Sequence, residues 1–367
     1  MTETSHAPRA PVASGPSAKF APCAALDLGS NNCRLLIATP RGAGFRIVDA
    51  FSRIVRLGEG VSRAGRLNDA AMDRALGALK VCADRIRRHG VRRVRAVATQ
   101  ACRVAANGED FVARVDRETG LKLEIISTQE EAHLSVAGCM DLLDPNFDVG
   151  LVLDVGGGST ELSWVDLRSG AGFATARRRP SISPRLMAWH SAPIGVVTLA
   201  ERFPEPTTGG LTNYRAMVDF MKTEIDRFAD ARAFRDDFAR GRGHIVGTSG
   251  AITSLASLHL DLPRYDRSRV DGLWMSREQC DQVVARLAAL TLRERAAQPC
   301  IGPDRADLVL AGAAILQAVQ ELWPSERVRV ADRGLREGLL LSLMRRPRGN
   351  TRRGRRAPTP AVSAQHT

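Results

Sequence analysis

The stretch LVLDVGGGSTELS, residues 151–163, constrains the fold of this chain more than any other. Apolar residues lead to Asp154, which predicts a buried strand that ends on a carboxylate able to hold a divalent cation through water. The three glycines at 156–158 carry no side chain, so their backbone N–H groups can approach an anion closely. Residues 159–160 add hydroxyl donors, and the β-like residues 161–165 lead the chain back. The stretch predicts a phosphate-binding hairpin, and a flexible glycine-rich turn is the plainer alternative.

A similar arrangement of strand, aspartate and polar turn lies upstream of this stretch. Residues 25–32, ALDLGSNN, contain Asp27, a glycine and a small polar turn, and the β-like residues 34–37 follow. The separation of Asp27 and Asp154 along the chain suits the opening strands of two similar domains. Two such loops, one in each domain, can close on a polyanion from opposite sides. Because short motifs also recur by chance, the repeat remains a hypothesis at this stage.

The size and composition of the chain indicate a soluble globular protein with two domains. The chain has 367 residues, and its 44% hydrophobic and 25% charged residues separate it from disordered chains. No apolar run reaches the roughly 18 residues that a membrane span requires, so we expect no membrane association. Residues 1–20 are rich in Ala, Pro and Ser and predict a flexible arm rather than a signal peptide. Seven scattered cysteines without a C-x-x-C pair indicate free thiols and a cytoplasmic protein.

The net charge of +13 is concentrated at one end of the chain. Residues 345–367 contain seven arginines and no acidic residue, so we predict a disordered basic tail over residues 347–367. Such a tail can bind nucleic acid, polyphosphate or another polyanion through the release of counterions. A solvated terminus without any part in catalysis is the alternative. The rest of the chain is mildly basic, which suits a polyanionic substrate.

Hydrophobic spacing and capping residues predict the elements around the two loops. We expect Asn68 to cap a helix that ends near Gly90. Further helices are predicted over residues 108–119, 128–143, 213–240, 276–290, 292–297 and 306–322 and from 334 to before 347, and further strands over residues 34–39, 45–57, 94–99, 121–127 and 328–330. Residues 100–103 are expected to lead toward a helix, and residues 193–199 are expected to lead into a helix that ends near Phe203. An Asp-Pro-Asn break places the domain boundary, so that residues 21–144 form the first domain and residues 145–346 the second.

Polar side chains near the strand ends of the first domain are candidates for function. Arg103 stands where a strand meets a helix, which suits an anion site, although it can also pair on the surface with an acid such as Glu109. Glu131 follows Thr128 by three residues, which is the spacing of a capping box. Its functional interpretation is a carboxylate at the seam between the domains. His133 is expected on a helix face rather than at a metal.

A third junction of strand, glycine and helix lies at residues 244–253, HIVGTSGAIT. Gly247 and Gly250 permit close approach of the backbone to a ligand, and the helix start beside them favours negative charge. A tightly packed turn without ligand contact is the alternative. The arginines at 177–179 predict a solvated loop, with contact to substrate as the alternative.

In these motifs the chain resembles the exopolyphosphatase / guanosine pentaphosphate phosphohydrolase family, the Ppx/GppA phosphatases, over about residues 24–344. DLGSNNCRLLI at residues 27–37 is similar to the family's D-x-G-S-N-S-x-R-L-x-I, and LEIISTQEEAHL is similar to its E-I-I-S-x-x-E-E-A segment. DVGGGSTEL at residues 154–162 matches without a change, and IGVVTL, GTSGAITSL and ADRGLREGLL follow in order. The resemblance implies the α/β superfold of actin, heat-shock chaperone ATPases and sugar kinases, a ribonuclease H-like fold with two domains and a cleft between them.

The resemblance also implies roles for single residues. Glu131, the second glutamate of the E-E-A segment, is implied as the catalytic residue that activates or orients water. Together with the third junction, the candidates for phosphate binding are Ser30, Asn31, Asn32, Arg103, Gly156, Gly157, Gly158, Ser159, Gly247, Thr248, Ser249 and Gly250. The implied metal is Mg²⁺, with Asp154 and Glu161 as expected ligands and Asp27 as a further candidate.

Two departures from the family pattern affect these expectations. Asn32 stands where the family usually has serine, but an amide can both donate and accept, so we expect phosphate binding to be kept. Longer family members add a C-terminal helical module resembling HD-type phosphohydrolases, for which we find no room in this sequence. Functions of that module in long-chain binding or pairing are therefore not expected of this chain.

The sequence thus predicts a magnesium-dependent hydrolase that releases the terminal phosphate of inorganic polyphosphate or guanosine pentaphosphate (pppGpp). The two substrates remain open, since both offer a terminal phosphoanhydride. A phosphotransferase of the same superfold and a non-catalytic sensor of polyphosphate or nucleotide are the alternatives. Relatives often pair, so a homodimer is possible.

Overall fold

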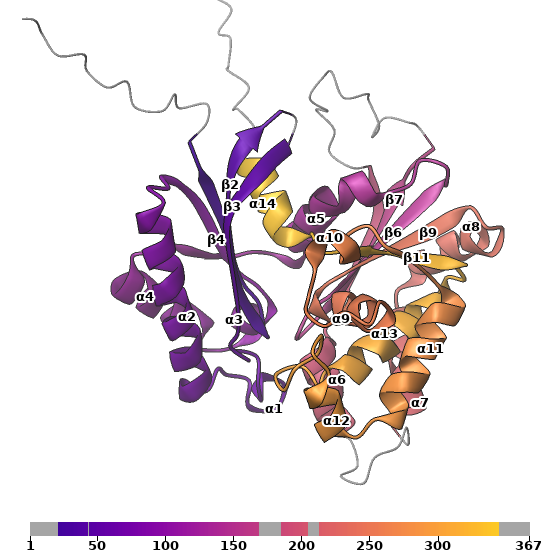
Figure 1. Cartoon of the computed structure of the whole chain (residues 1–367). Helices are drawn as coiled ribbons and strands as arrows, with labels where there is room; N and C mark the ends of the chain where they lie inside the picture. Colours follow the sequence, from indigo (N-terminus) through magenta and orange to yellow (C-terminus); the bar gives the residue numbers. More distant parts are fainter. Residues whose placement is uncertain (1–20, 43, 169–184, 205–212, 345–367) are drawn as a thin grey trace, which may run out of the picture.

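Two mixed β-sheets lie side by side in the computed structural model, and helices flank each of them (Figure 1). The structure describes residues 21–42, 44–168, 185–204 and 213–344. The predicted N-terminal arm, the arginines at 177–179 and the basic tail lie outside the described residues, so the interpretations of these segments stay predictions.

The first sheet has five strands in the order β3-β2-β1-β4-β5. The strands are β1 (Cys23–Leu28), β2 (Asn32–Arg41), β3 (Gly44–Ile54), β4 (Arg93–Ala98) and β5 (Leu123–Ile125). Helices α2 and α4 pack on its outer face around a core that includes Leu26, Leu35 and Phe111 (Figure 1). The predicted strand at 121–127 is present but shorter.

The second sheet has six strands in the order β10-β11-β9-β6-β7-β8. The strands are β6 (Val149–Val155), β7 (Thr160–Asp166), β8 (Leu186–Ala192), β9 (Gly243–Thr248), β10 (Trp274–Ser276) and β11 (Arg327–Ala331). Its larger core joins helices α7, α9, α11 and α13 to one face of the sheet. The sequence analysis did not predict β8 or β10, which form an edge of the sheet at either side.

The opening strands of the two sheets have the same pairing. β1 pairs antiparallel with β2 and parallel with β4, and β6 pairs antiparallel with β7 and parallel with β9. Asp27 lies opposite Arg34 in the first hairpin, and Asp154 lies opposite Glu161 in the second. The repeat that the sequence suggested is therefore a repeat of structure.

The helices are α1 (Val61–Ala64), α2 (Asp69–Arg88), α3 (Gln100–Val104), α4 (Gly108–Thr119), α5 (Thr128–Cys139), α6 (Val196–Arg202), α7 (Tyr214–Asp226), α8 (Arg235–Ala239), α9 (Gly250–His259), α10 (Arg267–Val270), α11 (Arg277–Ala289), α12 (Leu292–Ala297), α13 (Val309–Leu322) and α14 (Leu335–Met344). Short 3₁₀ turns follow at Met140–Leu142 and Ala229–Phe234. Asn68 caps α2 as predicted, by accepting a hydrogen bond from the Ala71 amide. Among the described helices, none has both the length and the apolar character to cross a membrane.

Two predictions about helices were wrong. The predicted helix over 213–240 ends at Asp226, because the chain turns at Phe228 and brings both Phe228 and Phe234 onto the ring of Trp164. The cap of α5 is Ser127 rather than Thr128. The Ser127 side chain accepts from the Glu130 amide, so Glu131 is not the partner in a capping box.

Helices α5 and α14 cross between the sheets in backbone contact (Figure 1). A Cβ on Gly138 would lie 2.0 Å from the carbonyl oxygen of Gly334, and a Cβ on Gly338 would lie 2.0 Å from that of Leu134. α14 packs against β1, β2 and β4 of the first sheet, whereas α5 packs against the second sheet. Both helices thus join the two halves of the chain, and the sequence boundary at residues 144/145 stays a prediction.

Candidate active site

A cleft between the two sheets collects most of the predicted site residues. The lining includes Asp27, Ser30, Asn31, Asn32, Glu131, Asp154, Gly156, Gly157, Gly158, Ser159, Glu161, Thr248, Ser249 and Gly250. Two predicted residues do not line it. Gly247 lies within β9 and faces the side chains of Ile252 and Val328, so it packs inside the second domain and does not face a ligand. Arg103 lies behind the lining and reaches it through Glu131.

The two predicted phosphate loops contact each other across the cleft. A Cβ on Gly157 would lie 2.9 Å from the Asn31 nitrogen, and a Cβ on Gly158 would lie 2.8 Å from the Ser30 hydroxyl. A side chain at Gly157 would require the backbone of the opposite loop to move, and one at Gly158 would require the side chains of Ser30 and Gln100 to move. The glycine-rich loop is therefore a packed contact between the domains and not a flexible turn.

Both loops keep free donors at the cleft. In the described part of the chain, the backbone N–H groups of Ser30, Asn31, Gly157, Gly158 and Ser159 have no hydrogen-bond partner. Successive unpaired N–H groups of this kind form an anion-binding concavity. The loops can thus surround an anion with backbone donors from both domains.

Hydrogen bonds at the back of the second loop hold it in place. The carbonyl oxygens of Gly156 and Gly157 accept from the amides of Val196 and Val197, at 3.0 and 2.8 Å. These two donors are orphan amides of the first turn of α6, which helices otherwise leave unsatisfied. The start of α6 therefore fixes the glycine-rich loop by its carbonyl oxygens, and the N–H groups of the loop remain open to a ligand.

Glu131 lies in the first turn of α5, where it is buried with 8% of its surface exposed. Arg103 donates from Nη1 to its Oε2 at 3.1 Å and also to the carbonyl oxygen of Ile126 at 2.7 Å. Gln100 accepts from the other arm of the guanidinium at 3.1 Å. The alternative pairing of Arg103 with Glu109 was wrong, because Arg103 is instead fixed in three directions behind the cleft.

The electrostatics around Glu131 favour its protonated form. Burial raises its pKa well above the usual range, repulsion from Glu161 adds to this, and Arg103 opposes it. A carboxylate with a raised pKa that faces a cleft is suited to accept a proton near neutral pH. His133, two residues further, is exposed and bonds only to the carbonyl of Gln129 at 2.7 Å, as predicted for a helix-face histidine.

Three further carboxylates meet in the cleft. Burial raises the pKa of Asp27 to about 6 and that of Glu161 to about 7, and the nearby Asp154 adds repulsion to both. The pKa of Asp154 is also raised by burial, although Ser135 donates a hydrogen bond to it at 2.5 Å. These neighbouring carboxylates resist ionisation because their negative charges repel one another. A cation bound between them would lower the free energy of the ionised state.

The donor set fits Mg²⁺ in its chemistry. Among the described residues, no group of three or more His, Cys, Asp or Glu side chains is placed so that it could hold a metal ion by itself. Mg²⁺ does not need such a group, because it usually keeps several waters and binds one or two carboxylates together with substrate phosphates. Asp27, Asp154 and Glu161 offer oxygen ligands of this kind. Buried Oδ1 atoms of Asn31 and Asn32 lack a hydrogen-bond partner in the described part of the chain and add uncommitted oxygens nearby.

Four arginines to which the sequence analysis gave no role line the same cleft: Arg34, Arg305, Arg333 and Arg336. Nη2 of Arg34 lies 3.1 Å from the position of a Cβ on Gly250, so this side chain reaches from the first sheet to the start of α9. Within the described residues, Arg34 and Arg336 make no hydrogen bond or ion pair. The hairpin register opposite Asp27 could have indicated Arg34, and the ADRGLREGLL motif contains Arg333 and Arg336. None of the motifs quoted above contains Arg305.

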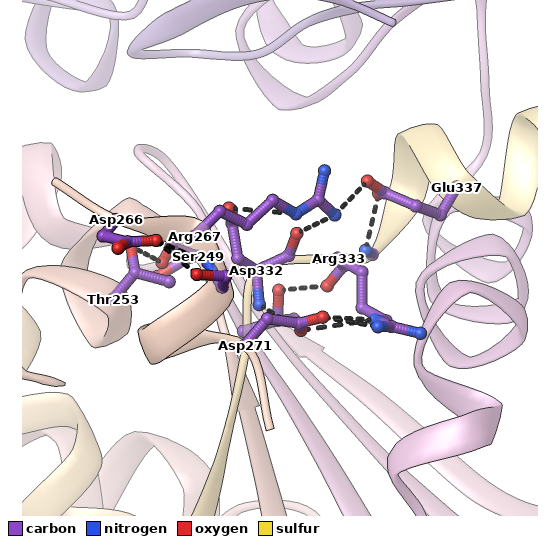
Figure 2. A network of polar contacts seen from close by, with 11 residues as sticks. Ser249, Thr253, Asp266, Arg267, Asp271, Asp332, Arg333 and Glu337 are labelled. Carbon is purple, nitrogen blue, oxygen red and sulfur yellow. Dashed lines mark hydrogen bonds and ion pairs between the residues drawn. The ribbon is translucent and has the colours of Figure 1, made fainter. Parts of the chain in front are cut away.

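A polar network holds the junction between β11 and α14 at the edge of the cleft (Figure 2). Arg267 donates to the carbonyl oxygen of Asp332 at 2.6 Å and to Glu337 at 3.0 Å. Glu337 in turn accepts from the Gly334 amide at 2.9 Å, and Asp271 accepts from the Asp332 amide at 3.0 Å. These bonds fix the backbone that carries Arg336 into the cleft.

Comparisons with known proteins point to one family. A model described as the Ppx/GppA phosphatase family matches residues 36–347. Exopolyphosphatase 2 of Mycobacterium tuberculosis is 31% identical over 338 residues, which cover 87% of this chain and 98% of that protein. Among solved structures, the Ppx/GppA family member of Aquifex aeolicus is 29% identical with a TM-score of 0.68, covering 88% of this chain and 97% of that one. An exopolyphosphatase from Cytophaga hutchinsonii has a TM-score of 0.76 at 23% identity, covering 88% and 97%. These structures confirm the predicted two-domain actin-like α/β fold.

Proposed function

Since this chain belongs to the Ppx/GppA phosphatase family, we propose that it hydrolyses the terminal phosphoanhydride bond of inorganic polyphosphate. The observation that carries the proposal is the meeting of unpaired amides from two loops with one buried carboxylate, Glu131, in a single cleft. A curated relative of nearly the same length is named an exopolyphosphatase, which supports this substrate class.

Glu131 is the proposed catalytic residue. Its carboxylate takes a proton from water, and the water oxygen attacks the terminal phosphorus while the bond to the bridging oxygen breaks. The shortened polyphosphate leaves with the bridging oxygen, and inorganic phosphate is the other product. Arg103 keeps the carboxylate oriented through the bond to Oε2, so the proton acceptor has one fixed direction.

The rest of the cleft would stabilise charge on the phosphoryl group. Phosphoryl transfer asks a protein mainly for positioning and for electrostatic stabilisation of the equatorial oxygens. The amides of both loops and the side chains of Arg34, Arg305 and Arg336 supply donors and positive charge for this purpose. One or two of the carboxylates of Asp27, Asp154 and Glu161 would hold Mg²⁺ together with the substrate phosphates, and the bound ion would neutralise part of the phosphate charge.

The test is an assay of phosphate release from purified protein with magnesium, given polyphosphate and pppGpp at matched concentrations. Release from polyphosphate supports the proposal, and release from pppGpp as well would extend it to the second substrate. Consumption of polyphosphate only with ADP and without free phosphate would favour a phosphotransferase. Binding of polyphosphate without any release would favour a sensor.

A further inference from the structure

A short segment of the first domain connects the two walls of the cleft at the side away from the α5–α14 crossing. The segment is residues 55–62, between β3 and the middle of α1. Its backbone is tied to the first phosphate loop: the amides of Val55 and Arg56 donate to the Asn31 carbonyl at 2.8 and 3.0 Å, and Gly58 donates to the Ser30 carbonyl at 2.8 Å.

The Arg56 side chain crosses to the second domain. Its two terminal nitrogens bind the two carboxylate oxygens of Asp307 at 2.8 and 3.0 Å, and Nη2 also donates to the carbonyl oxygen of Asp304 at 3.1 Å. A bidentate pair of this kind fixes direction as well as distance. Arg305, which lies between these two partners, lines the cleft.

The backbone of Arg56 is in a conformation that a side chain rarely adopts. Its φ is +47°, in the left-handed region where residues other than glycine are disfavoured. Such a conformation persists only where the surroundings determine it. Here the hydrogen bond from the Arg56 amide to Asn31 holds the residue from the first domain. The side-chain hydrogen bonds to Asp307 and to the carbonyl oxygen of Asp304 hold it from the second.

A second tie lies beside the first. Glu201 of α6 accepts from the Gly60 amide at 3.0 Å and from the Ser62 hydroxyl at 3.1 Å. α6 is the helix whose first turn holds the glycine-rich loop. The segment 55–62 therefore bonds the first phosphate loop directly, and it is linked to the glycine-rich loop through α6.

We infer that Arg56 is a positioning residue that holds the two walls of the cleft together and sets the place of Arg305 against the first loop. With Arg56 lost, the arrangement in which the two walls are joined is less populated, and the apparent affinity for substrate falls in proportion to the fraction of molecules that remain joined. The kinetic part of this inference depends on the proposed polyphosphate hydrolysis, whereas the structural part does not.

The first arm of the test measures distance. Spin labels are placed at Ala70→Cys on α2 and Arg293→Cys on α12, both exposed, and the seven native cysteines are buried and spared. We expect one narrow distance distribution in otherwise unchanged protein and a broader, longer one in Arg56→Gln, which inorganic tripolyphosphate with magnesium narrows again. Superimposable distributions with and without the substitution would overturn the inference.

The second arm measures kinetics without labels. Arg56→Gln should raise KM for polyphosphate roughly 5–50-fold with kcat changed less than about threefold, and Arg56→Lys should restore part of the loss, since it keeps the charge but not the bidentate fork. The matched control is Arg85→Gln, which breaks an ion pair with Asp49 at 2.7 Å inside the first domain and should leave KM unchanged. Equal effects of both substitutions would refute a role in joining the walls.

Folding and function are separated by two further measurements. Asp307→Asn tests the same bond from the other side, and a cooperative thermal transition confirms that each variant is folded. If no form of the protein releases phosphate, the proposed function fails, but the distance measurement with tripolyphosphate still decides whether Arg56 joins the walls.

Discussion

Arg103 donates from Nη1 to Oε2 of Glu131 at 3.1 Å, and both side chains are largely shielded from solvent, with 18% and 10% exposed. The arginine comes from α3 and the glutamate from α5, so this bond joins two elements that approach each other only in the folded chain. The Arg103 charge lowers the pKa of Glu131, against burial and three neighbouring carboxylates that raise it.

Loss of the Arg103 charge should therefore raise the pKa of Glu131 further. A general base must be ionised, so in Arg103→Met the acid limb of kcat/KM for polyphosphate should move to higher pH by roughly 1–3 units. Arg103→Lys, which keeps the charge, should move it less. The control is Arg95→Met, since Arg95 forms its ion pair with the half-buried Glu130 instead. A limb at the same pH in Arg103→Met would contradict the assignment of Glu131 as base.

Replacement of Glu131 by glutamine should lower turnover roughly 10²–10⁴-fold while polyphosphate binding is largely kept. The amide is similar in size but cannot accept a proton from water. Phosphate release and equilibrium binding of polyphosphate are measured on the same preparation. Glu130→Gln, one residue away and half-buried, should behave like the unchanged protein. Normal turnover in Glu131→Gln would remove this residue from the mechanism.

Gly157→Ala should separate the two phosphate loops. The new Cβ would lie 2.9 Å from the Asn31 nitrogen and 3.1 Å from the Ser30 Cβ, so one loop must move. A displacement of about 1 Å at reacting groups can cost roughly 10²-fold in rate, and we expect a fall of that order. Gly77→Ala in the exposed middle of α2 has open space around its Cβ and should instead stabilise the protein by about 0.5–1 kcal/mol. Full activity of Gly157→Ala would show that the loops need not touch.

Magnesium should stabilise the protein more at pH 8 than at pH 5.5. The folded pKa values of Asp27 and Glu161, about 6 and about 7, lie above those of free carboxyls, so the metal-free protein loses stability as pH rises from about 4 to 7. The ionised carboxylates then bind the cation, and a concentration of 100 Kd adds about 2.7 kcal/mol to the free energy of unfolding. Thermal unfolding with magnesium or with sodium chloride of equal ionic strength tests this. If magnesium raised the unfolding temperature equally at both pH values, or still raised it in Asp154→Asn, the result would argue against the site.

His244 should make the protein sensitive to acid independently of the cleft. It is fully buried, its Nε2 accepts from the Asp144 amide at 3.0 Å, and burial lowers its pKa to about 4. The unfolded chain protonates this histidine near pH 6.5, whereas the folded protein does so only near pH 4. The free energy of unfolding is therefore highest above pH 6.5 and falls by about 3 kcal/mol at most as the pH drops to about 4. His244→Gln can accept the same hydrogen bond without titrating, so urea unfolding between pH 4 and 7 should show a flatter dependence. Parallel curves would rule out this source of acid sensitivity.

The two aspartate hairpins and the glycine-rich loop were predictable because their determinants are local. A strand that ends on Asp154, a run of glycines and a returning strand follow one another in sequence, and turn geometry depends on neighbouring residues. The same holds for the Asn68 cap, which is set by a residue three positions away. By contrast, the predicted helix over 213–240 failed because Phe228 and Phe234 stack on Trp164, which is far away in sequence.

The sequence by itself thus determined the two repeated loops, the family and the identity of the acidic residues near the cleft. Only the tertiary structure decided that Arg103 fixes Glu131 from behind, that Gly247 faces the sheet, and that Arg34, Arg305 and Arg336 converge on one cleft. The physical reason is range. Hairpins and caps are set by bonds between residues close in sequence, whereas the joining of the walls depends on contacts such as Arg56 with Asp307, which form only when two separate cores have packed.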